Sequence, residues 1–416
     1  MNIIFLSFLV GIFFLIDLYI FQGFKTIYGN HPETVYAIWM PRIFWIVNAG
    51  FYVLLLSSIL TINRDKGMQT LQVITINTFI ALMIPKLIFM GFMWVEDLAR
   101  LAQGSYSAIF ANSDDDFMPS RRAFISKVAL GAAAIPFAAI VYGILKGKYD
   151  YTVRRHSLYF KDLPDAFDGF TITQLSDFHA GSFDNQEAVR KGLELANQQQ
   201  SDLFVFTGDL VNNEAGEVLP YLPYFNSISA PYGKFSILGN HDYGDYKSWS
   251  SIEEKRNNLL QLFEHHQTMG FRLLRNEHMK IEKDGQAIHL VGVENWGHGF
   301  SKYGDFEKAI DGAPKDSFKI LLSHDPTHWE KEVKKHNTHI HLTLAGHTHG
   351  AQMGVELGNF KWSPIQYRYA KWAGIYKEFE KYLHINRGFG FLAFSGRVGI
   401  LPEITVLTLR QWTIDN

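Results

Sequence analysis

The sequence predicts a bundle of four membrane-spanning helices followed by an α/β domain. Two observations predict this division. Four long apolar stretches lie within the first 145 of the 416 residues, and after Lys148 short β-prone runs alternate with polar helical runs. A chain of this length also exceeds what one compact core usually holds. We therefore expect a transmembrane helical region over 1–148 and a separate domain over 149–416.

The composition restricts the chemistry that this domain can perform. The chain has 39 Lys and Arg against 41 Asp and Glu, a formal net charge of -2, so the charge balance does not indicate a nucleic-acid partner. It has no cysteine, which excludes disulfides, thiolate nucleophiles and sulfur-ligated metals. A bound metal would need His, Asp, Glu or Asn ligands, and these suit manganese, iron or zinc.

Each apolar stretch reaches the ~20 residues that a helix needs to cross a bilayer. Flanking basic residues favour membrane spans over buried helices of a soluble protein. Two charges, Asp17 and Lys86, lie inside the stretches; they are either functional intramembrane groups or charges that face the bundle or the interface. The predicted spans are about 3–22, 43–62, 71–94 and 124–145, the last uncharged from 128 onward.

The segment Ser120–Lys127, directly before the fourth span, resembles a twin-arginine export signal placed inside the chain. The alternative is a pair of positive-inside arginines, Arg121 and Arg122, that flank a helix. The other basic residues do not fix the orientation. We expect the domain after the fourth span to lie on the extracytoplasmic side.

Beyond Lys148 the apolar runs are short and separated by polar segments, as in α/β domains. The expected helices cover 186–198, 217–228 and 251–268, the second limited by Pro220 and Pro223. The expected strands are 170–175, 202–206, 234–238, 288–293, 318–322, 340–345, 382–386 and 404–409.

Five of these strands end in metal-ligand residue types. In an open α/β sheet the carboxyl ends of the strands face a common crevice, so we expect these groups to meet there. Buried together without a cation they would suffer desolvation and mutual repulsion, which a pair of divalent ions would offset. The five blocks are Asp177-Phe178-His179, Gly208-Asp209, Gly239-Asn240-His241-Asp242, Ser323-His324-Asp325 and Gly346-His347-Thr348-His349-Gly350.

The order and content of these blocks resemble the calcineurin-like metallophosphoesterase superfamily. The resemblance covers 177–349 and implies two packed, mixed β-sheets flanked by helices. The stretches 386–390 and 402–404 resemble a membrane-linked branch of that superfamily, which includes YkuE-like phosphoesterases and proteins compared with UDP-2,3-diacylglucosamine pyrophosphatases.

The resemblance also implies roles for individual residues. The first metal ion would be held by Asp177, His179, Asp209 and His349, and the second by Asp209, Asn240, His324 and His347. Asp209 would bridge the two ions, because its two oxygens offer lone pairs on different sides.

The implied reaction is hydrolysis of a phosphoester or pyrophosphate bond by a metal-bridging hydroxide. His241 would protonate the leaving group, and Asp242 would orient His241. The implied cofactor is a pair of divalent ions, manganese first, with iron or zinc as alternatives.

The membrane tether suggests a lipid-linked or glycolipid substrate, although a soluble nucleotide or phosphomonoester also fits. A non-catalytic membrane scaffold that uses the same fold to bind a partner is the alternative to an enzyme. A transporter or sensor whose helices are the main function is a third. Filled ligand positions favour the enzyme.

Several other residues allow two interpretations. Arg387 and Arg397 either contact a substrate phosphate or form structural pairs near the last strands. The aromatic segment 360–376 forms either a rim that meets lipid headgroups or a packed loop over the sheet. His265 and His266 lie on a polar helix and are expected to be solvated. The remaining candidates, expected to be packed or surface histidines, are His289 and His341.

Overall fold

The computed structural model describes residues 3–28, 34–110, 119–297, 299, 301–358 and 360–413. The chain divides into two compact units. The first comprises Met1–Ile62 and Met68–Tyr142, and the second comprises Asn63–Gly67 and Gly143–Asn416. The last turn of the fourth apolar helix therefore belongs to the second unit.

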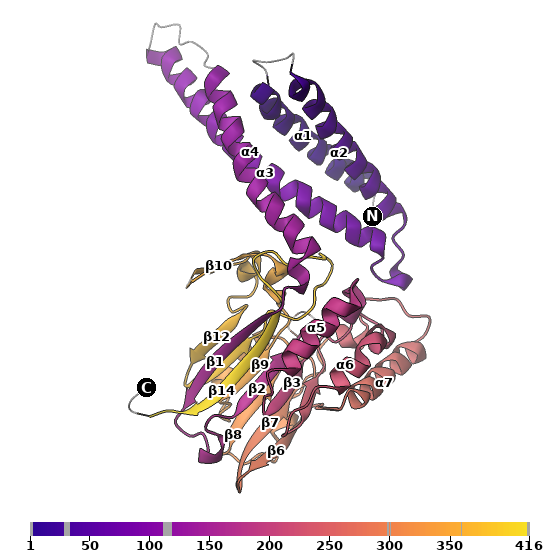
Figure 1. Cartoon of the computed structure of the whole chain (residues 1–416), viewed down its shortest axis with the longest axis vertical. Coiled ribbons are helices and arrows are strands. Elements are labelled where there is room, and N and C mark those ends of the chain that lie inside the picture. The colour runs from indigo at the N-terminus through magenta and orange to yellow at the C-terminus, as the bar shows by residue number, and fades with distance from the viewer. Residues whose placement is uncertain are drawn as a thin grey trace. The chain divides into compact units, whose positions relative to one another are not determined.

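The first unit is built from four long helices (Figure 1). All four are long and apolar enough to cross a membrane, over Phe8–Ile27, Val35–Leu60, Thr70–Tyr106 and Arg121–Leu145. The predicted four-helix membrane part is confirmed, and the protein is a multi-pass membrane protein. The helices are α1 (Ile3–Tyr28), α2 (Val35–Leu60), α3 (Thr70–Phe110) and α4 (Pro119–Leu145).

The two charges inside the spans pair with each other. Lys86 Nζ lies 2.6 Å from an oxygen of Asp17, and both side chains are buried. The Tyr52 hydroxyl donates to Asp17, and Lys86 donates to the amide oxygen of Asn48. Both charges therefore face the inside of the helix bundle, which was one of the two interpretations that the sequence allowed.

The second unit contains two mixed six-stranded sheets and a two-stranded hairpin. In the first sheet β2 to β5 are parallel, β14 runs antiparallel to β2, and β1 runs parallel to β14. The order is β1 (Thr152–Phe160), β14 (Glu403–Gln411), β2 (Thr171–Leu175), β3 (Leu203–Thr207), β4 (Lys234–Ile237) and β5 (Phe271–Leu273).

The second sheet has four parallel strands in its centre, from β13 to β7, and an antiparallel strand at each edge. The order is β12 (Gly374–Glu378), β13 (Lys381–Ile385), β9 (Leu342–Ala345), β8 (Phe318–Leu322), β7 (Gln286–Gly292) and β6 (Glu277–Lys283).

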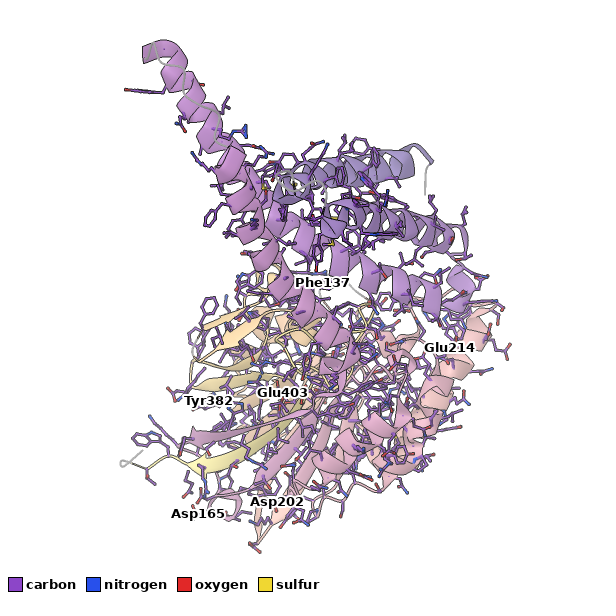
Figure 2. All side chains as sticks on the ribbon, turned by 45° about the horizontal axis from the view of Figure 1, so that its top comes forward. Phe137, Asp165, Asp202, Glu214, Tyr382 and Glu403 are labelled. Carbon is purple, nitrogen blue, oxygen red and sulfur yellow. The ribbon has the colours of Figure 1, made fainter. Side chains whose placement is uncertain are left out.

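The alternation of side chains along β3 explains the layers. Leu203 and Val205 face the second sheet and share a core with its residues Ile320 and Leu344. Phe204 and Phe206 point to the other side. The side chains of this shared core fill the space between the sheets, and Figure 2 draws the side chains on the ribbon. Each sheet is therefore buried on both faces, as expected for parallel strands.

Helices cover the outer face of each sheet. Over the first sheet lie α5 (Gln186–Asn197), α6 (Leu222–Asn226) and α7 (Ile252–Thr268), which contribute Leu193, Phe225 and Leu262 to the core. Over the second lie α8 (Phe306–Ile310) and α9 (Thr327–Lys331), which contribute Phe306 and Trp329. The architecture of two packed mixed sheets flanked by helices is confirmed.

The prediction that His265 and His266 are solvated is wrong. Both side chains are buried, and His266 Nδ1 lies 2.9 Å from Ser236 Oγ on β4. The helix α7 lies on the sheet along a wider face than its leucines indicate. The helix expected over 217–228 is a 3-10 turn (Ala215–Tyr221) followed by the short α6.

Candidate metal centre

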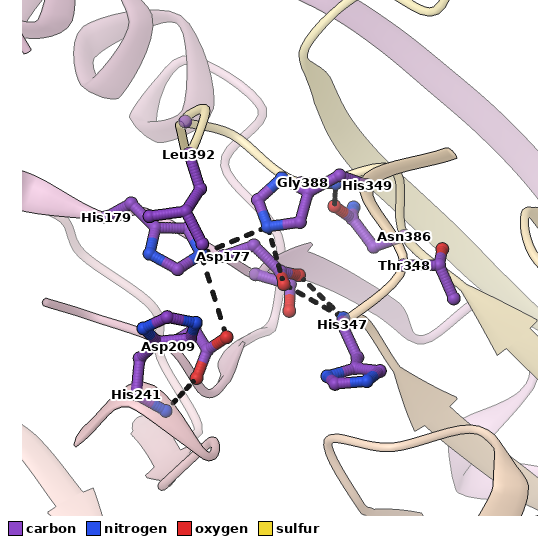
Figure 3. Close-up of polar contacts among 12 residues, drawn as sticks. Asp177, His179, Asp209, His241, His347, Thr348, His349, Asn386, Gly388 and Leu392 are labelled. Carbon is purple, nitrogen blue, oxygen red and sulfur yellow. Dashed lines mark hydrogen bonds and ion pairs between the residues drawn. The ribbon is translucent and has the colours of Figure 1, made fainter. Parts of the chain in front are cut away.

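The predicted site residues follow strands that lie next to each other. β2, β3 and β4 are neighbours in the first sheet, and β8 and β9 are neighbours in the second. The loops after these five strands carry Asp177 and His179, Asp209, Asn240 and His241, His324, and His347 and His349, in that order. All eight residues meet at one edge of the two sheets (Figure 3 labels six of them).

The first group consists of Asp177, His179 and His349. His349 Nε2 lies 3.2 Å from Asp177 Oδ1 and 3.0 Å from His179 Nε2. All three side chains are buried. Two imidazole nitrogens at this separation, beside a buried carboxylate, direct three donor atoms at one point.

The second group consists of Asp209, His324 and His347. His324 Nε2 lies 3.1 Å from Asp209 Oδ2 and 3.3 Å from His347 Nδ1. The amide oxygen of Asn240 lies 2.9 Å from the same His347 Nδ1. Asn240 therefore adds a neutral oxygen to the two imidazoles and the carboxylate.

One carboxylate oxygen joins the two groups. Asp209 Oδ2 lies 3.6 Å from His179 Nε2 in the first group and 3.1 Å from His324 Nε2 in the second. Asp209 Oδ1 accepts a hydrogen bond of 2.9 Å from the backbone N–H of His241. Figure 3 shows the resulting line of contacts from His349 through His179 and Asp209 to His241.

The backbone of these loops is strained. Asp177, His179, Asp209, His347 and His349 all have positive φ, between 50° and 74°. Non-glycine residues rarely adopt this left-handed conformation, and each such residue costs of order 1–3 kcal/mol. Strain of this kind persists where the geometry of a site requires it, and here five of the site residues carry it.

Two glycines are required by close approach. A Cβ at Gly346 would collide with Ser176 Oγ and the carboxylate of Asp177, and a Cβ at Gly239 would collide with the carboxylate of Asp209. The Gly-His and Gly-Asn pairs of the sequence therefore make room for the carboxylates beside them.

The electrostatics of the cluster suit bound cations. Burial lowers the pKa of His179 to about 3 and that of His347 to about 4, so both imidazoles are neutral, which is the ligand form. Burial opposes the charge of Asp209, but the neighbouring His324 and His241 outweigh it and hold the pKa of Asp209 well below its usual range. Burial raises the pKa of Asp177 to about 6. A nearby cation would remove that cost.

The donor set fits two divalent ions. Each group offers at least one carboxylate oxygen and two imidazole nitrogens, and the sequence contains no cysteine thiolate that competes. The remaining imidazole nitrogens are held from behind, since His324 Nδ1 donates to Thr207 O at 2.7 Å and His179 Nδ1 donates to Asn212 Oδ1 at 3.1 Å. Such contacts fix the tautomer that directs Nε2 at a metal.

His241 is held by Asn212. Its Nδ1 donates to the backbone oxygen of Asn212 at 2.9 Å, which leaves Nε2 for a substrate. The expectation that Asp242 orients His241 is not met. The carboxylate of Asp242 instead accepts the backbone N–H groups of Asp209, Leu210, Val211 and Gly239, so it holds the two loops together.

Sequence reasoning missed three residues that hold the site residues. Asn212 contacts both His179 and His241. The hydroxyl of Tyr246 accepts from the amide nitrogen of Asn240 at 2.8 Å, and that of Tyr369 lies 2.9 Å from His347 Nε2. The position of Asn212, three residues after Asp209, was the one available signal. The two tyrosines come from loops that no pattern connects to the strands.

The two arginines near the C-terminus have structural partners. Arg387 pairs with Glu403 and Glu356, each at 2.6 Å. Arg397 is fully buried and donates to the backbone oxygens of Arg387, Gly388 and Gly390. The structural alternative therefore describes both residues.

A further group of three possible ligands, Asp162, His339 and His341, lies away from this centre. His341 Nδ1 accepts the backbone N–H of Lys319 at 3.0 Å, so Nε2 carries the proton that is donated to Asp162 at 2.7 Å. His341 is thus a packed histidine with a carboxylate partner, as expected.

Comparison with known proteins agrees with this geometry. Residues 170–351 match the family described as calcineurin-like phosphoesterase, and residues 1–148 match one described as probable calcineurin-like phosphoesterase, transmembrane domain. The chain is 29% identical over 302 residues to the uncharacterized metallophosphoesterase YkuE of Bacillus subtilis (strain 168), covering 70% of this chain and 98% of YkuE.

Two further relatives show the same likeness. The transmembrane protein with metallophosphoesterase domain of Danio rerio is 26% identical over 329 residues, covering 76% of this chain and 68% of the relative. The uncharacterized metallophosphoesterase YkoQ of Bacillus subtilis (strain 168) is 25% identical over 288 residues, covering 67% of this chain and 97% of YkoQ. The name of the Danio rerio relative joins a transmembrane part to a metallophosphoesterase domain, the same two parts that the family models match in this chain.

Proposed function

Because the chain belongs to the calcineurin-like metallophosphoesterases that carry an N-terminal four-helix transmembrane domain, we propose that it is a membrane-anchored, metal-dependent phosphoric ester hydrolase. It hydrolyses a phosphoester or pyrophosphate bond. The observation that carries this proposal is the position of Asp209 Oδ2 between two His/Asp groups, at 3.6 and 3.1 Å from their nearest imidazole nitrogens.

The residues would act as follows. Asp177, His179, Asp209 and His349 would hold one cation, and Asp209, Asn240, His324 and His347 would hold the other. Two divalent ions bound there would supply an activated water and a clamp for the phosphoryl oxygens. We expect manganese first, with iron or zinc as alternatives for these nitrogen and oxygen donors.

His241 delivers the proton that the leaving oxygen needs. Its Nδ1–H is held by the backbone oxygen of Asn212, so the opposite nitrogen, Nε2, is the one that reaches a substrate. Proton transfer by a side chain held in this way typically contributes about 10²–10⁴-fold to a rate. A non-catalytic scaffold is less well supported, because every candidate ligand lies in the cluster.

Asp209→Asn tests the proposal. The change keeps the shape but removes the charge that both groups share, so the full chain purified in detergent should lose bound metal and hydrolysis of a generic aryl phosphodiester. Metal per chain is measured by elemental mass spectrometry, and folding by circular dichroism. The matched control is Asp316→Asn, an exposed carboxylate. Unchanged metal content and turnover in Asp209→Asn would refute the proposal.

The location of the hydrolase is the second part of the proposal. We place the membrane region at 1–148, the hydrolase domain at 149–416, and that domain on the extracytoplasmic side, supported by the twin arginines in the first turn of α4. A domain tethered there suits a lipid-linked substrate. A C-terminal reporter that is active only in the cytoplasm should stay silent, and an active reporter would contradict this orientation.

A further inference from the structure

The hairpin formed by β10 (Val355–Leu357) and β11 (Phe360–Trp362) turns its apolar side chains to the outside and its charged side chains toward the domain, the reverse of most surface hairpins. Val355 pairs with Trp362 and Leu357 with Phe360, so these four apolar side chains lie on one face. That face is exposed; Leu357 is 71% and Phe360 61% accessible. The charged pair between them, Glu356 and Lys361, points the other way.

The charged face is what fixes the hairpin to the domain. Glu356 pairs with Arg154 and Arg387, both at 2.6 Å, and Lys361 Nζ donates to Ala373 O at 2.6 Å. An isolated two-stranded hairpin is marginally stable in water, so these contacts determine its orientation. The apolar face is thereby held outward by buried and half-buried ion pairs, and it is not the result of a loose loop.

The exposed apolar residues are concentrated in this part of the domain. Tyr367, five residues after Trp362, adds a side chain that is 80% accessible. Contiguous exposed apolar surface on a folded domain marks a contact with a partner or a membrane. The combination of leucine, phenylalanine, tryptophan and tyrosine is the one enriched at the boundary between lipid headgroups and acyl chains.

The base of the hairpin lies close to the point where the chain leaves its fourth span. The span runs to Leu145, and its last residues belong to the same compact unit as the hairpin. The backbone N–H of Arg397 donates to Gly143 O at 3.2 Å. The next residue, Val398, accepts from the backbone N–H of Gly354 at 2.9 Å, one residue before β10 begins.

We propose that the apolar face of this hairpin, Val355, Leu357, Phe360 and Trp362, inserts into the interface of the bilayer that the four helices span. The occupant is the lipid bilayer because the hairpin lies close to the spanning helix. Gly354, directly before β10, is hydrogen-bonded to Val398, and the neighbouring Arg397 is hydrogen-bonded to Gly143 of the helix. Lys146, directly after the span, is exposed and is a cation of the kind that anionic headgroups attract.

The insertion has a consequence for the metal centre, which rests on the proposed function. The segment that follows β11 leads in seven residues to Tyr369, whose hydroxyl lies 2.9 Å from His347 Nε2. One continuous segment therefore joins the inserted face to a side chain of the centre. A phosphorylated headgroup at the bilayer surface is the substrate class that this arrangement favours.

The absence of cysteine makes a direct test possible. The full chain with Leu357→Cys or Phe360→Cys is labelled with a nitroxide and reconstituted into vesicles of phosphatidylcholine and phosphatidylglycerol. Collision rates are measured with oxygen, which partitions into lipid, and with a water-soluble nickel chelate. Matched controls are Ile252→Cys and Phe379→Cys, at apolar positions that are 90% and 68% accessible.

Labels at 357 and 360 should show an oxygen-to-nickel ratio several-fold above both controls. A ratio equal to the controls would overturn the proposal. So would protection from both reagents together with dipolar broadening between labels, because a second copy of the chain would then cover the face. This measurement does not depend on activity, so it separates failure of the insertion from failure of the proposed hydrolysis.

Discussion

The amide of Asn240 has an oxygen and a nitrogen, and only the oxygen can bind a cation. Its nitrogen donates to the hydroxyl of Tyr246 at 2.8 Å, and its oxygen faces His347 Nδ1. The ring of Tyr246 also lies against that of His241, with 4.4 Å between ring centroids. A single tyrosine hydroxyl thus selects which end of the amide faces the second group.

Tyr246→Phe should weaken metal binding at the second group, because the amide of Asn240 loses the acceptor that fixes its orientation. We expect a loss of about tenfold in metal affinity, the lower end for contacts behind a ligand, since Tyr246 is half exposed. Competition with a chelator measures the affinity in the full chain. Tyr224→Phe, which removes a surface hydroxyl bonded to Gln186, is the control. Equal affinities in the two variants would contradict the role of Tyr246.

At this scale the sequence predicts ligands better than it predicts their supports. Asp209 or His347 stands directly after an apolar strand, so a local pattern locates it. Tyr369 reaches His347 from a loop 22 residues further on, and only the folded chain brings the two together. Asp242 belongs to the predicted site segment, but it bonds to backbone N–H groups and not, as predicted, to His241. Such backbone partners have no signature in the sequence.

At the scale of elements, the charges inside the membrane helices determine how α1 and α3 are paired. Asp17 on α1 and Lys86 on α3 are 2.6 Å apart and buried. Removing one partner of a buried pair leaves an uncompensated charge and typically costs about 3–5 kcal/mol. Replacing both by neutral residues of similar size avoids that cost.

Asp17→Asn and Lys86→Met should therefore each lower the thermal midpoint of the full chain in detergent, and the double variant should lower it less than either single change. Scanning calorimetry or a thermal scan of helix content gives the three midpoints. A double variant whose loss equals the sum of the single losses would show that the two side chains do not interact.

The strands that sequence reasoning found are the buried ones. β3 and β8 are continuous apolar runs and were predicted within a residue or two of their observed ends. β1 and β6 were not, since Arg154 and Arg155 interrupt the apolar pattern of the first, and the second alternates with lysine and glutamate. Both are edge strands, where one side needs no apolar neighbour. The sequence did not predict the hairpin β10–β11, because its apolar side chains face outward and its charged side chains face the domain.

At the scale of the whole molecule, the five ligand loops meet because two sheets pack face to face with their carboxyl strand ends at the same edge. The sequence predicted a single crevice from strand ends, and the resemblance implied two packed sheets, but only the structure shows which strands share a sheet. Hydrophobic patterning cannot decide that, because β2 and β9 are buried on both faces and carry polar side chains among the apolar ones.

Packing of the outer helices adds a dependence of stability on pH. His266 lies between α7 and the first sheet, with Nδ1 bonded to Ser236, and burial lowers its pKa from 6.5 to about 3. In the unfolded chain His266 is therefore protonated below about pH 6.5, whereas in the folded chain it is protonated only below about pH 3. In this window the free energy of unfolding falls as pH falls, by at most about 1.4 kcal/mol per pH unit for this group.

His266→Gln should reduce that dependence, because glutamine keeps a polar contact with Ser236 but has no proton to gain. The thermal midpoint of the second unit is followed in the full chain by near-ultraviolet circular dichroism at pH 8 and pH 5, with chelator present so that metal release is excluded. Substitution shifts the pH 8 midpoint by its packing cost, so the informative quantity is the difference between the two pH values. That difference should shrink in His266→Gln; if it matches that of the parent chain, the histidine is not neutral in the folded state.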